Sequence, residues 1–465
     1  CLFLPNWMNA QSLPNTSSLD DFDRLDFAIF ITMVKENHPL AKRAEILKKL
    51  GEATVLQSRG NFDPTLEGEK QIKEYDGLKY YETNQLKFKI PSGYGISLEG
   101  GFYNNEGLYL NTQNRLPQEG LFAAGVRVDL LKGSWINDRR ATLRKAQAFE
   151  TQTLAERELM RNEVIYNATL SYLEWVKQQQ NFVAIESVIK AAKIRYQGIR
   201  KLVIQGDLAA IDSLEAKTVI QDREMILLKT QADLNVSKLR VSNFLWSENG
   251  IPLELLENTK AETSFGDQLD LSLIQFGNSS DRFDLENHPK LKALRAKIEV
   301  LNIDRKLKIN GLLPQLSFNY SLINEQPLNN IPLDFGQYKG GISFKMPLFL
   351  RKERGALNLS KLKLKDAYFN FDLEVIKLEN KIKELYFKWY NSQKIFQVNA
   401  DIVVGYRKLL IAEERKFDLG ESSLFMINSR ELKFLQVLLK QNELAFELLK
   451  TKATLLNTLQ ITDAP

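Results

Sequence analysis

The spacing of hydrophobic residues along this chain alternates between the period of helices and the period of strands. From Asp20 to Gly60 apolar and charged residues recur at helical intervals. In the second half the period becomes two, with serine and asparagine between the apolar residues Leu316, Phe318, Tyr320 and Leu322. A period of two places alternate side chains on opposite faces, so this run predicts a strand with one apolar and one polar face.

A second alternating run, Ile342, Phe344, Met346 and Leu348, follows a loop rich in Asn, Pro and Gly, and the two runs predict a β-hairpin. The first half holds further candidate strands, near 62–72, 84–90, 94–103 and 121–131. The sequence therefore predicts two strands from the second half and four from the first.

Two unusually long helical stretches follow the strands, at about 134–205 and 351–419, and both are almost free of proline. Each ends in a short polar turn, Gln205-Gly206-Asp207 or Leu419-Gly420-Glu421, after which a second helix returns. The second returning helix carries a coiled-coil seam, formed by Leu432, Leu435, Leu439, Phe446 and Leu449. We expect two long antiparallel helical hairpins.

This order of elements is an internal duplication. Asn37-His38-Pro39 recurs as Asn287-His288-Pro289, a shift of 250 residues (287 − 37), whereas Gly206 recurs as Gly420, a shift of 214 (420 − 206). The difference, 250 − 214 = 36 residues, is an insertion in the first copy between Pro64 and Tyr172. We expect the insertion to form one additional hairpin.

The two copies define the domains. The first repeat covers 20–246, with strands in 62–131 and its helical tip at 206, and the second covers 286–460, with strands in 314–349 and its tip at 420. An inter-repeat linker or equatorial segment at 247–285 is rich in Gly, Asn, Ser and Pro, and 461–465 is a tail.

Residues 1–19 precede the first repeat. The first ten, CLFLPNWMNA, have the features of the tail of a secretory signal, with a small residue before Gln11. Alternatively, Cys1 is the lipid-bearing first residue of a lipoprotein. Both interpretations place the protein outside the cytoplasm. Cys1 is the only cysteine, so we expect stability to come from packing and assembly rather than from an intramolecular disulfide.

Charge and residue types argue against several functions. The 63 basic residues are interleaved with 58 acidic ones, a net charge of +5, which is typical of solvated helix faces and not of a nucleic-acid-binding surface. The chain has two histidines and no HExxH, GxSxG or Walker signature in a suitable context. We expect no catalysis, no cofactor and no metal site.

The apolar faces of the strands have no evident partner, because the helices carry seams of their own. Closing the strands into a barrel shared between subunits would place these faces against lipid and leave no free edge. The alternative is a pair of soluble α/β domains with coiled-coil arms.

In this order and in two copies, the motifs resemble the TolC-type outer-membrane efflux proteins, over about 25–460. The resemblance is carried by the Asn-x-Pro helix starts at 37–39 and 287–289, by Leu313-Pro314-Gln315-Leu316, by Met346-Pro347-Leu348-Phe349 and by the repeated glycine turn. It implies an α+β membrane protein, with four to six amphipathic strands per protomer pooled into a trimeric β-barrel. The antiparallel coiled-coil hairpins would form a periplasmic tunnel.

The function that the resemblance implies is a homotrimeric exit channel in outer-membrane lipid, part of a tripartite efflux or type I secretion system. Substrates would come from a periplasmic adaptor (membrane fusion) protein and an inner-membrane pump of RND or ABC type. The tips, with Gly206, Asp207, Gly420 and Glu421, would dock the adaptor. The alternative function is a soluble periplasmic coiled-coil adaptor or scaffold, although adaptors carry one helical hairpin where this chain has two.

The gate implied by the resemblance is altered in this chain. The family joins an aspartate after the first glycine to a tyrosine and an arginine beside the second, but this chain has Phe417 and Ser422 in place of those partners. The candidate gate and pore residues are Asp212, Glu215, Phe417, Met426 and Ser429. Acidic side chains repeated around an axis would favour cations. Asp212 and Glu215 are equally well explained as solvated residues near the N-terminus of a helix. The helix dipole stabilises negatively charged side chains at that end.

The sequence leaves open whether the additional hairpin crosses the membrane. The alternating run Leu86, Phe88 and Ile90 is shorter than the roughly 9–11 residues of a membrane strand. The alternative is that about 75–120 projects as an extracellular hairpin. We expect six strands per protomer, of which at least four cross.

Overall fold

The computed structural model describes residues 17–18, 23–263, 285–325 and 336–461. Cys1 and the signal-like segment lie outside the described residues, as do 264–284 of the predicted linker and 462–465 of the predicted tail. Within the part that is described, no helix is both long enough and apolar enough to cross a membrane.

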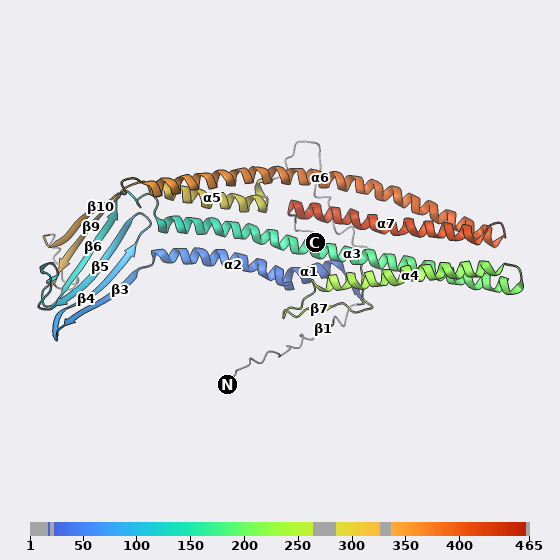
Figure 1. Ribbon diagram of the computed structural model, residues 1–465, viewed down its shortest axis with the longest axis horizontal. Coiled ribbons are helices and arrows are strands. Elements are labelled where there is room, and N and C mark those ends of the chain that lie inside the picture. The colour runs from blue at the N-terminus through green and yellow to red at the C-terminus, as the bar shows by residue number, and fades with distance from the viewer. Residues whose placement is uncertain (1–16, 19–22, 264–284, 326–335, 462–465) are drawn as a thin grey trace, which may run out of the picture. The chain divides into compact units, whose positions relative to one another are not determined.

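The chain forms two compact units. The first consists of 1–45, 157–288 and 375–465, and the second of 46–156 and 289–374. The helices are α1 Phe27–Asn37, α2 Pro39–Arg59, α3 Asp138–Gln205, α4 Ala210–Ser242, α5 Pro289–Asn310, α6 Arg351–Asp418 and α7 Leu424–Leu459 (Figure 1). Short 3-10 helices cover Gly60–Phe62, Thr112–Asn114 and Leu285–Asn287. Helices α2 and α5 begin at the prolines of the two Asn-His-Pro motifs, as the sequence predicts.

The second unit contains one antiparallel sheet of six strands in the order β10-β9-β6-β5-β4-β3 (Figure 1). The strands are β3 Thr65–Tyr75, β4 Leu78–Pro91, β5 Ile96–Glu106, β6 Leu121–Asp129, β9 Gln315–Asn324 and β10 Tyr338–Lys345. Four come from the first copy and two from the second, which confirms the prediction from the alternating runs.

Strands β3 and β4 form the first hairpin of the sheet. Asp76 and Gly77 join the two strands with φ angles of 55° and 70°, the backbone that two-residue hairpin turns require. The sequence predicted a short strand at 84–90, yet β4 has 14 residues, because the largely polar stretch 78–85 also pairs with β3. The predicted length of this strand was therefore wrong.

Helices of the second unit pack at the base of the sheet. Ile136, Ala141 and Ile303 form a small buried cluster, which joins the start of α3 to α5. Asn310 Nδ2 donates a hydrogen bond of 2.7 Å to the Ile136 carbonyl, and Lys145 forms a 2.6 Å ion pair with Asp304.

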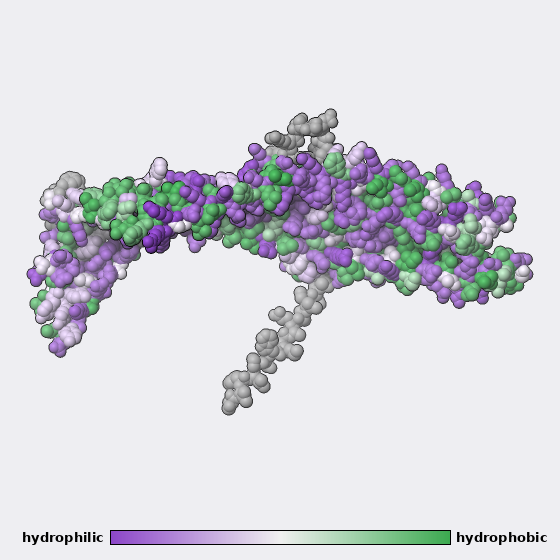
Figure 2. Space-filling view, turned by 45° about the horizontal axis from the view of Figure 1, so that its top comes forward, coloured by the Kyte–Doolittle hydropathy of each residue, from purple (hydrophilic) through white to green (hydrophobic). Residues whose placement is uncertain are grey.

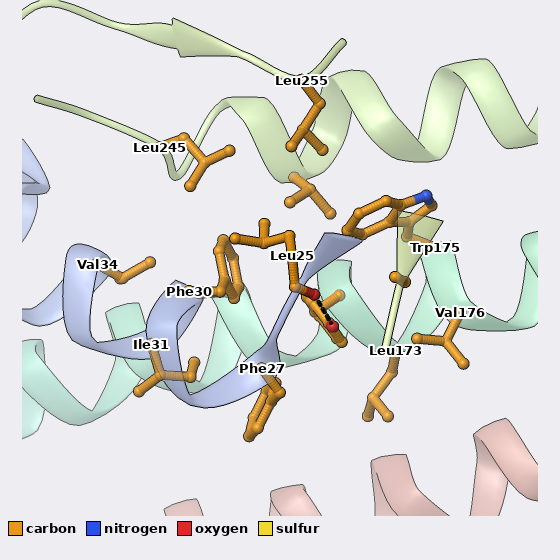
Figure 3. Packing of buried hydrophobic residues seen from close by; sticks show 14 of the residues in the cluster. Leu25, Phe27, Phe30, Ile31, Val34, Leu173, Trp175, Val176, Leu245 and Leu255 are labelled. Atoms are coloured by element: carbon orange, nitrogen blue, oxygen red, sulfur yellow. Dashed lines mark hydrogen bonds between the residues drawn. The ribbon is translucent and has the colours of Figure 1, made fainter. Parts of the chain in front are cut away.

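The main core of the first unit lies where α1, α3 and α4 meet (Figure 3). Tyr172 and Trp175, the aromatic pair that the sequence assigned to packing, are fully buried there. The Tyr172 hydroxyl donates to the Leu25 carbonyl at 2.7 Å, the dashed line of Figure 3, and accepts from the Glu262 N–H. Burial raises the pKa of this hydroxyl, so it stays protonated and keeps its donor.

The N-terminal segment is joined to the segment after α4 by two short parallel strand pairs. Strand β1, Ser17–Ser18, pairs with β7, Leu253–Glu254. Strand β2, Arg24–Leu25, pairs with β8, Lys260–Ala261. Backbone pairing and the Tyr172 hydroxyl thus hold the segment that leads into α1.

Candidate functional site

The turns at the ends of the two helical hairpins have the same hydrogen-bonding pattern. In the first, the N–H groups of Gly206 and Asp207 donate to the carbonyls of Val203 and Leu202. In the second, those of Gly420 and Glu421 donate to Phe417 and Lys416, the equivalent positions. Each pair is a Schellman motif, which satisfies the last carbonyls of a helix and places its glycine in the left-handed region. The φ angles are +86° at Gly206 and +77° at Gly420.

All four residues predicted for the docking tip are exposed: Gly206, Asp207, Gly420 and Glu421. Apolar side chains flank them. Ile211 and Phe425 hold equivalent positions in the two copies (425 − 211 = 214) and are 71% and 68% exposed. Figure 2 shows hydrophobic side chains scattered over the exposed surface of the helical hairpins. Ile211 and Phe425 thus add exposed apolar area beside each of the two turns.

The two hairpins pack against each other just behind these turns. Ile199 of α3, Ala216 of α4 and Leu424 of α7 form a buried cluster, and Phe417 packs on it from α6. Phe417 therefore has an apolar contact where the resembling family has a polar one. The sequence identified the substitution, but not the contact that replaces the polar bond.

Ser422 makes its hydrogen bond within its own hairpin. Its hydroxyl donates to Glu413 Oε1 at 2.7 Å, and Arg430 Nε lies 3.4 Å from the other carboxylate oxygen. The Ser422 hydrogen bond, followed by Arg430, holds the pKa of Glu413 below its ordinary value. At the next residue, Ser423 caps α7 by accepting from the Met426 N–H. These bonds tie the turn of the second hairpin to its own two helices.

The remaining predicted gate residues lie in the first two turns of α4 and α7. Glu215 accepts a hydrogen bond from Asn428 Nδ2 at 3.1 Å, which joins the two hairpins. Asp212 is half-exposed, and its carboxylate has no hydrogen bond or ion pair to any described residue. Met426 and Ser429 are exposed. The structure thus brings Glu215, but not Asp212, against the second hairpin.

Sequence analysis missed a buried charge cluster further from the turns. Glu431 of α7 is only 2% exposed and lies between two arginines. Arg195 of α3 donates to its Oε2 at 2.8 Å, and Arg223 Nε of α4 lies 3.8 Å from its Oε1. Arg195 also pairs with Glu414 of α6 at 3.5 Å, so charges from all four helices meet. The one signal in the sequence is that Glu431 falls at helical spacing between Ile427 and Leu435, both buried.

The sheet of the second unit is reversed relative to the sheet of a soluble protein, because its apolar side chains are exposed and its buried ones are polar. One face carries exposed apolar side chains from all six strands: Leu66, Ile72, Leu86, Phe88, Ile90, Ile96, Leu98, Val126, Phe318, Ile342 and Phe344. The opposite face is polar and contains buried residues, among them Thr83, Ser97 and Ser317. Ser317 Oγ donates to Asp129 Oδ1 at 2.7 Å there, and Lys89 pairs with Glu99. Among the described residues, no group of His, Cys, Asp or Glu has an arrangement that could hold a metal ion.

Comparison with known proteins gives matches among solved structures. The CmeC outer membrane channel of Campylobacter jejuni is 13% identical at a TM-score of 0.65, covering 100% of this chain and 96% of that chain. The outer membrane protein VceC of Vibrio cholerae is 13% identical at 0.64, covering 93% and 95%. The open-state MtrE outer membrane channel of Neisseria gonorrhoeae is 12% identical at 0.64, covering 99% and 98%.

No protein-family model matches the sequence, and no curated protein does. At these identities the likeness concerns the backbone, and it extends over nearly the whole of each chain. The protein has the α+β fold of these outer-membrane channels.

Proposed function

We propose that three copies of this chain form an exit channel in the outer membrane of a Gram-negative-type cell, with the helical hairpins in the periplasm. The observation that carries the proposal is the reversed sheet. In water, exposed apolar side chains on six neighbouring strands would cost free energy, whereas in lipid the same face is favourable and the polar face lines a wet lumen. A sheet of this kind is therefore suited to a membrane.

The alternative function, a soluble periplasmic adaptor or scaffold, does not explain the exposed apolar face of the sheet. It also does not explain why the structural similarity extends over the whole length of the chain. A soluble sheet buries its apolar face, and here that face is the exposed one. The structural similarity covers nearly the whole of several outer-membrane channels and not one hairpin alone. Both features favour a channel. Because these neighbours are channels rather than enzymes, we assign no catalytic step to the chain.

The exposed tips of the helical hairpins indicate which proteins would bind the channel. The exposed turns at Gly206 and Gly420, with Ile211 and Phe425 beside them, would dock a periplasmic adaptor, which connects the channel to an inner-membrane pump of RND or ABC type. The two tips differ in side chains but share one backbone conformation. An adaptor with a repeated binding element could therefore bind both turns of each protomer.

Cell fractionation tests the proposed location. The protein should remain with outer membranes after osmotic release of the periplasm, dissolve only in detergent, and run as a trimer that heating converts to monomer. A periplasmic marker protein is the control. Release of the chain together with that marker would reject the channel.

Replacing both Asp212 and Glu215 with their amides should lower the cation preference of the channel. Three protomers each carrying two carboxylates would present six negative charges around the axis, and removing them weakens the attraction for cations. The measurement is the reversal potential of single channels in a salt gradient. Glu421→Gln, at an exposed position in the turn itself, is the control for a carboxylate removed elsewhere. An unchanged reversal potential would show that Asp212 and Glu215 do not face the pore.

A further inference from the structure

The six-stranded sheet ends in two free edges. β10 and β3 stand at opposite ends of its strand order, and neither has a second neighbouring strand within the described residues. Along each outer edge, backbone N–H and C=O groups are left for another strand to bind. In lipid such an edge is costly, because no water is present to satisfy it.

The edge of β5 is already occupied. β4 pairs with β5 from Glu82 opposite Glu106 to Pro91 opposite Ser97. β3 in turn pairs with β4 from Thr65 opposite Lys89 onward. A neighbouring sheet could join β5 directly only if it displaced the whole β3–β4 hairpin. The β3–β4 hairpin therefore provides the edge at which another sheet has to join.

The hairpin shares the reversed pattern of the other strands. Leu86, Phe88 and Ile90 of β4 are exposed, whereas Lys87 and Lys89 between them are half-buried on the polar face. Phe88 stands opposite Leu66 of β3 on the apolar face. β3 has 11 residues and β4 has 14, and the part of each that would lie in lipid is the apolar section alone.

The apolar section of the hairpin ends before its turn. Lys70, Asn84 and Asn104 lie opposite one another on the same face, in three neighbouring strands. Glu82 then pairs with Lys70 at 2.7 Å and with Lys79 at 2.6 Å. Charged groups at this level belong in water, so the hairpin has an apolar base and a polar turn region beyond the lipid.

The directions of the edge strands match. In an antiparallel sheet with an even number of strands the two edge strands run in opposite directions. β3 of one copy can therefore lie beside β10 of another as an antiparallel pair, with both apolar faces on the same side. Such a contact joins two different surfaces, and repeating it closes a ring when the rotation between copies is that of the proposed trimer.

The charges of the two edges match as well. Glu67 and Glu69 lie on the polar face of β3, and Lys339 and Lys345 lie on the polar face of β10. Within the described part of the chain, neither Glu67 nor either lysine has an ion pair. Lys73 follows on this face of β3 only near the turn, so along the apolar section the β3 edge is acidic and the β10 edge is basic. The two edges are complementary when copies meet edge to edge.

From these observations we propose that β3 of one copy pairs with β10 of the next, so that all six strands of each protomer belong to one closed sheet. The inference rests on the proposed trimer and identifies the surface through which its sheets join. Three copies of six strands give 18 strands (3 × 6). The lumen would be about 1.5 times as wide as in a barrel from which β3 and β4 are left out, because barrel diameter grows roughly linearly with strand number.

Disulfide crosslinking tests the pairing. Ser343→Cys on the polar face of β10 is combined, one at a time, with cysteine at Thr65, Glu67 or Glu69 on the same face of β3. A matched set combines it with cysteine at Ser97, Glu99 or Tyr103 of β5. In one chain β3 and β10 are separated by five strand spacings, about 24 Å, so a disulfide between them has to join two copies.

After oxidation, the β3 set should give covalent dimers and trimers on a denaturing gel, and the β5 set should give none. Cys1 is present in every variant, so the parent protein and Ser343→Cys alone define the background. Crosslinks in the β5 set, or in neither set while heat-sensitive trimers form, would overturn the pairing and leave the proposed channel intact. A parent protein that forms no trimer would instead reject the proposed function.

Discussion

Gly420→Val should reduce export strongly while the protein still assembles in the membrane. Gly420 has a φ angle of +77°, and no heavy atom lies within 4 Å of the position that a Cβ would take. Valine would therefore strain only the backbone of the turn, by about 1–3 kcal/mol. Strain of this size lowers the population of the native turn, and with it the affinity for the adaptor, by about 5- to 150-fold. Export is measured in cells that carry the matching pump and adaptor.

Gly405→Val is the matched control. Gly405 lies inside α6 without a positive φ angle, and the space around its Cβ position is also open. Valine is compatible with helical backbone, so export should stay close to normal. Gly206→Val should repeat the effect of Gly420→Val, because the two turns have the same hydrogen bonds. Normal export by Gly420→Val at normal abundance would contradict a role of this turn in docking.

The sequence predicted the parts of the fold that depend on local spacing. The positions of β5, β6, β9 and β10 were predictable from alternating apolar residues, because each of these strands has one apolar face along most of its length. The glycines located both helical turns, since only glycine readily adopts the left-handed backbone that a Schellman motif requires. Asn-His-Pro located the starts of α2 and α5.

Features that depend on long-range contacts were not predictable in this way. Most of β4 before Leu86 is polar, so its length follows from pairing with β3 and β5 and not from any alternation of its own. The buried cluster on which Phe417 packs combines Ile199 and Ala216 of the first hairpin with Leu424 of the second. The four charges around Glu431 likewise come from four helices, and no sequence spacing connects them.

Glu431→Ala is expected to destabilise the helical hairpins by about 3–5 kcal/mol, the usual cost of removing one partner from a buried ion pair. Arg223 is 5% exposed, so without Glu431 its guanidinium would lack the nearest opposite charge. Arg195 would keep Glu414 as a partner, at the longer distance of 3.5 Å. The measurement is the thermal midpoint of helix loss by circular dichroism, together with amide hydrogen exchange in α4 and α7.

Glu443→Ala is the control on the same helix. Glu443 is 43% exposed and pairs with Lys177 at 3.1 Å. Because Glu443 is exposed and Lys177 keeps Glu174 as a second partner at 2.9 Å, we expect a cost of about 0–1 kcal/mol and hardly any change of the midpoint. The destabilisation should also be local, with faster exchange near Arg195, Arg223 and Glu431 and unchanged exchange in the sheet. Equal midpoints for Glu431→Ala and Glu443→Ala would show that the buried cluster does not hold the hairpins together, and that the apolar contacts around Leu424 and Leu435 suffice.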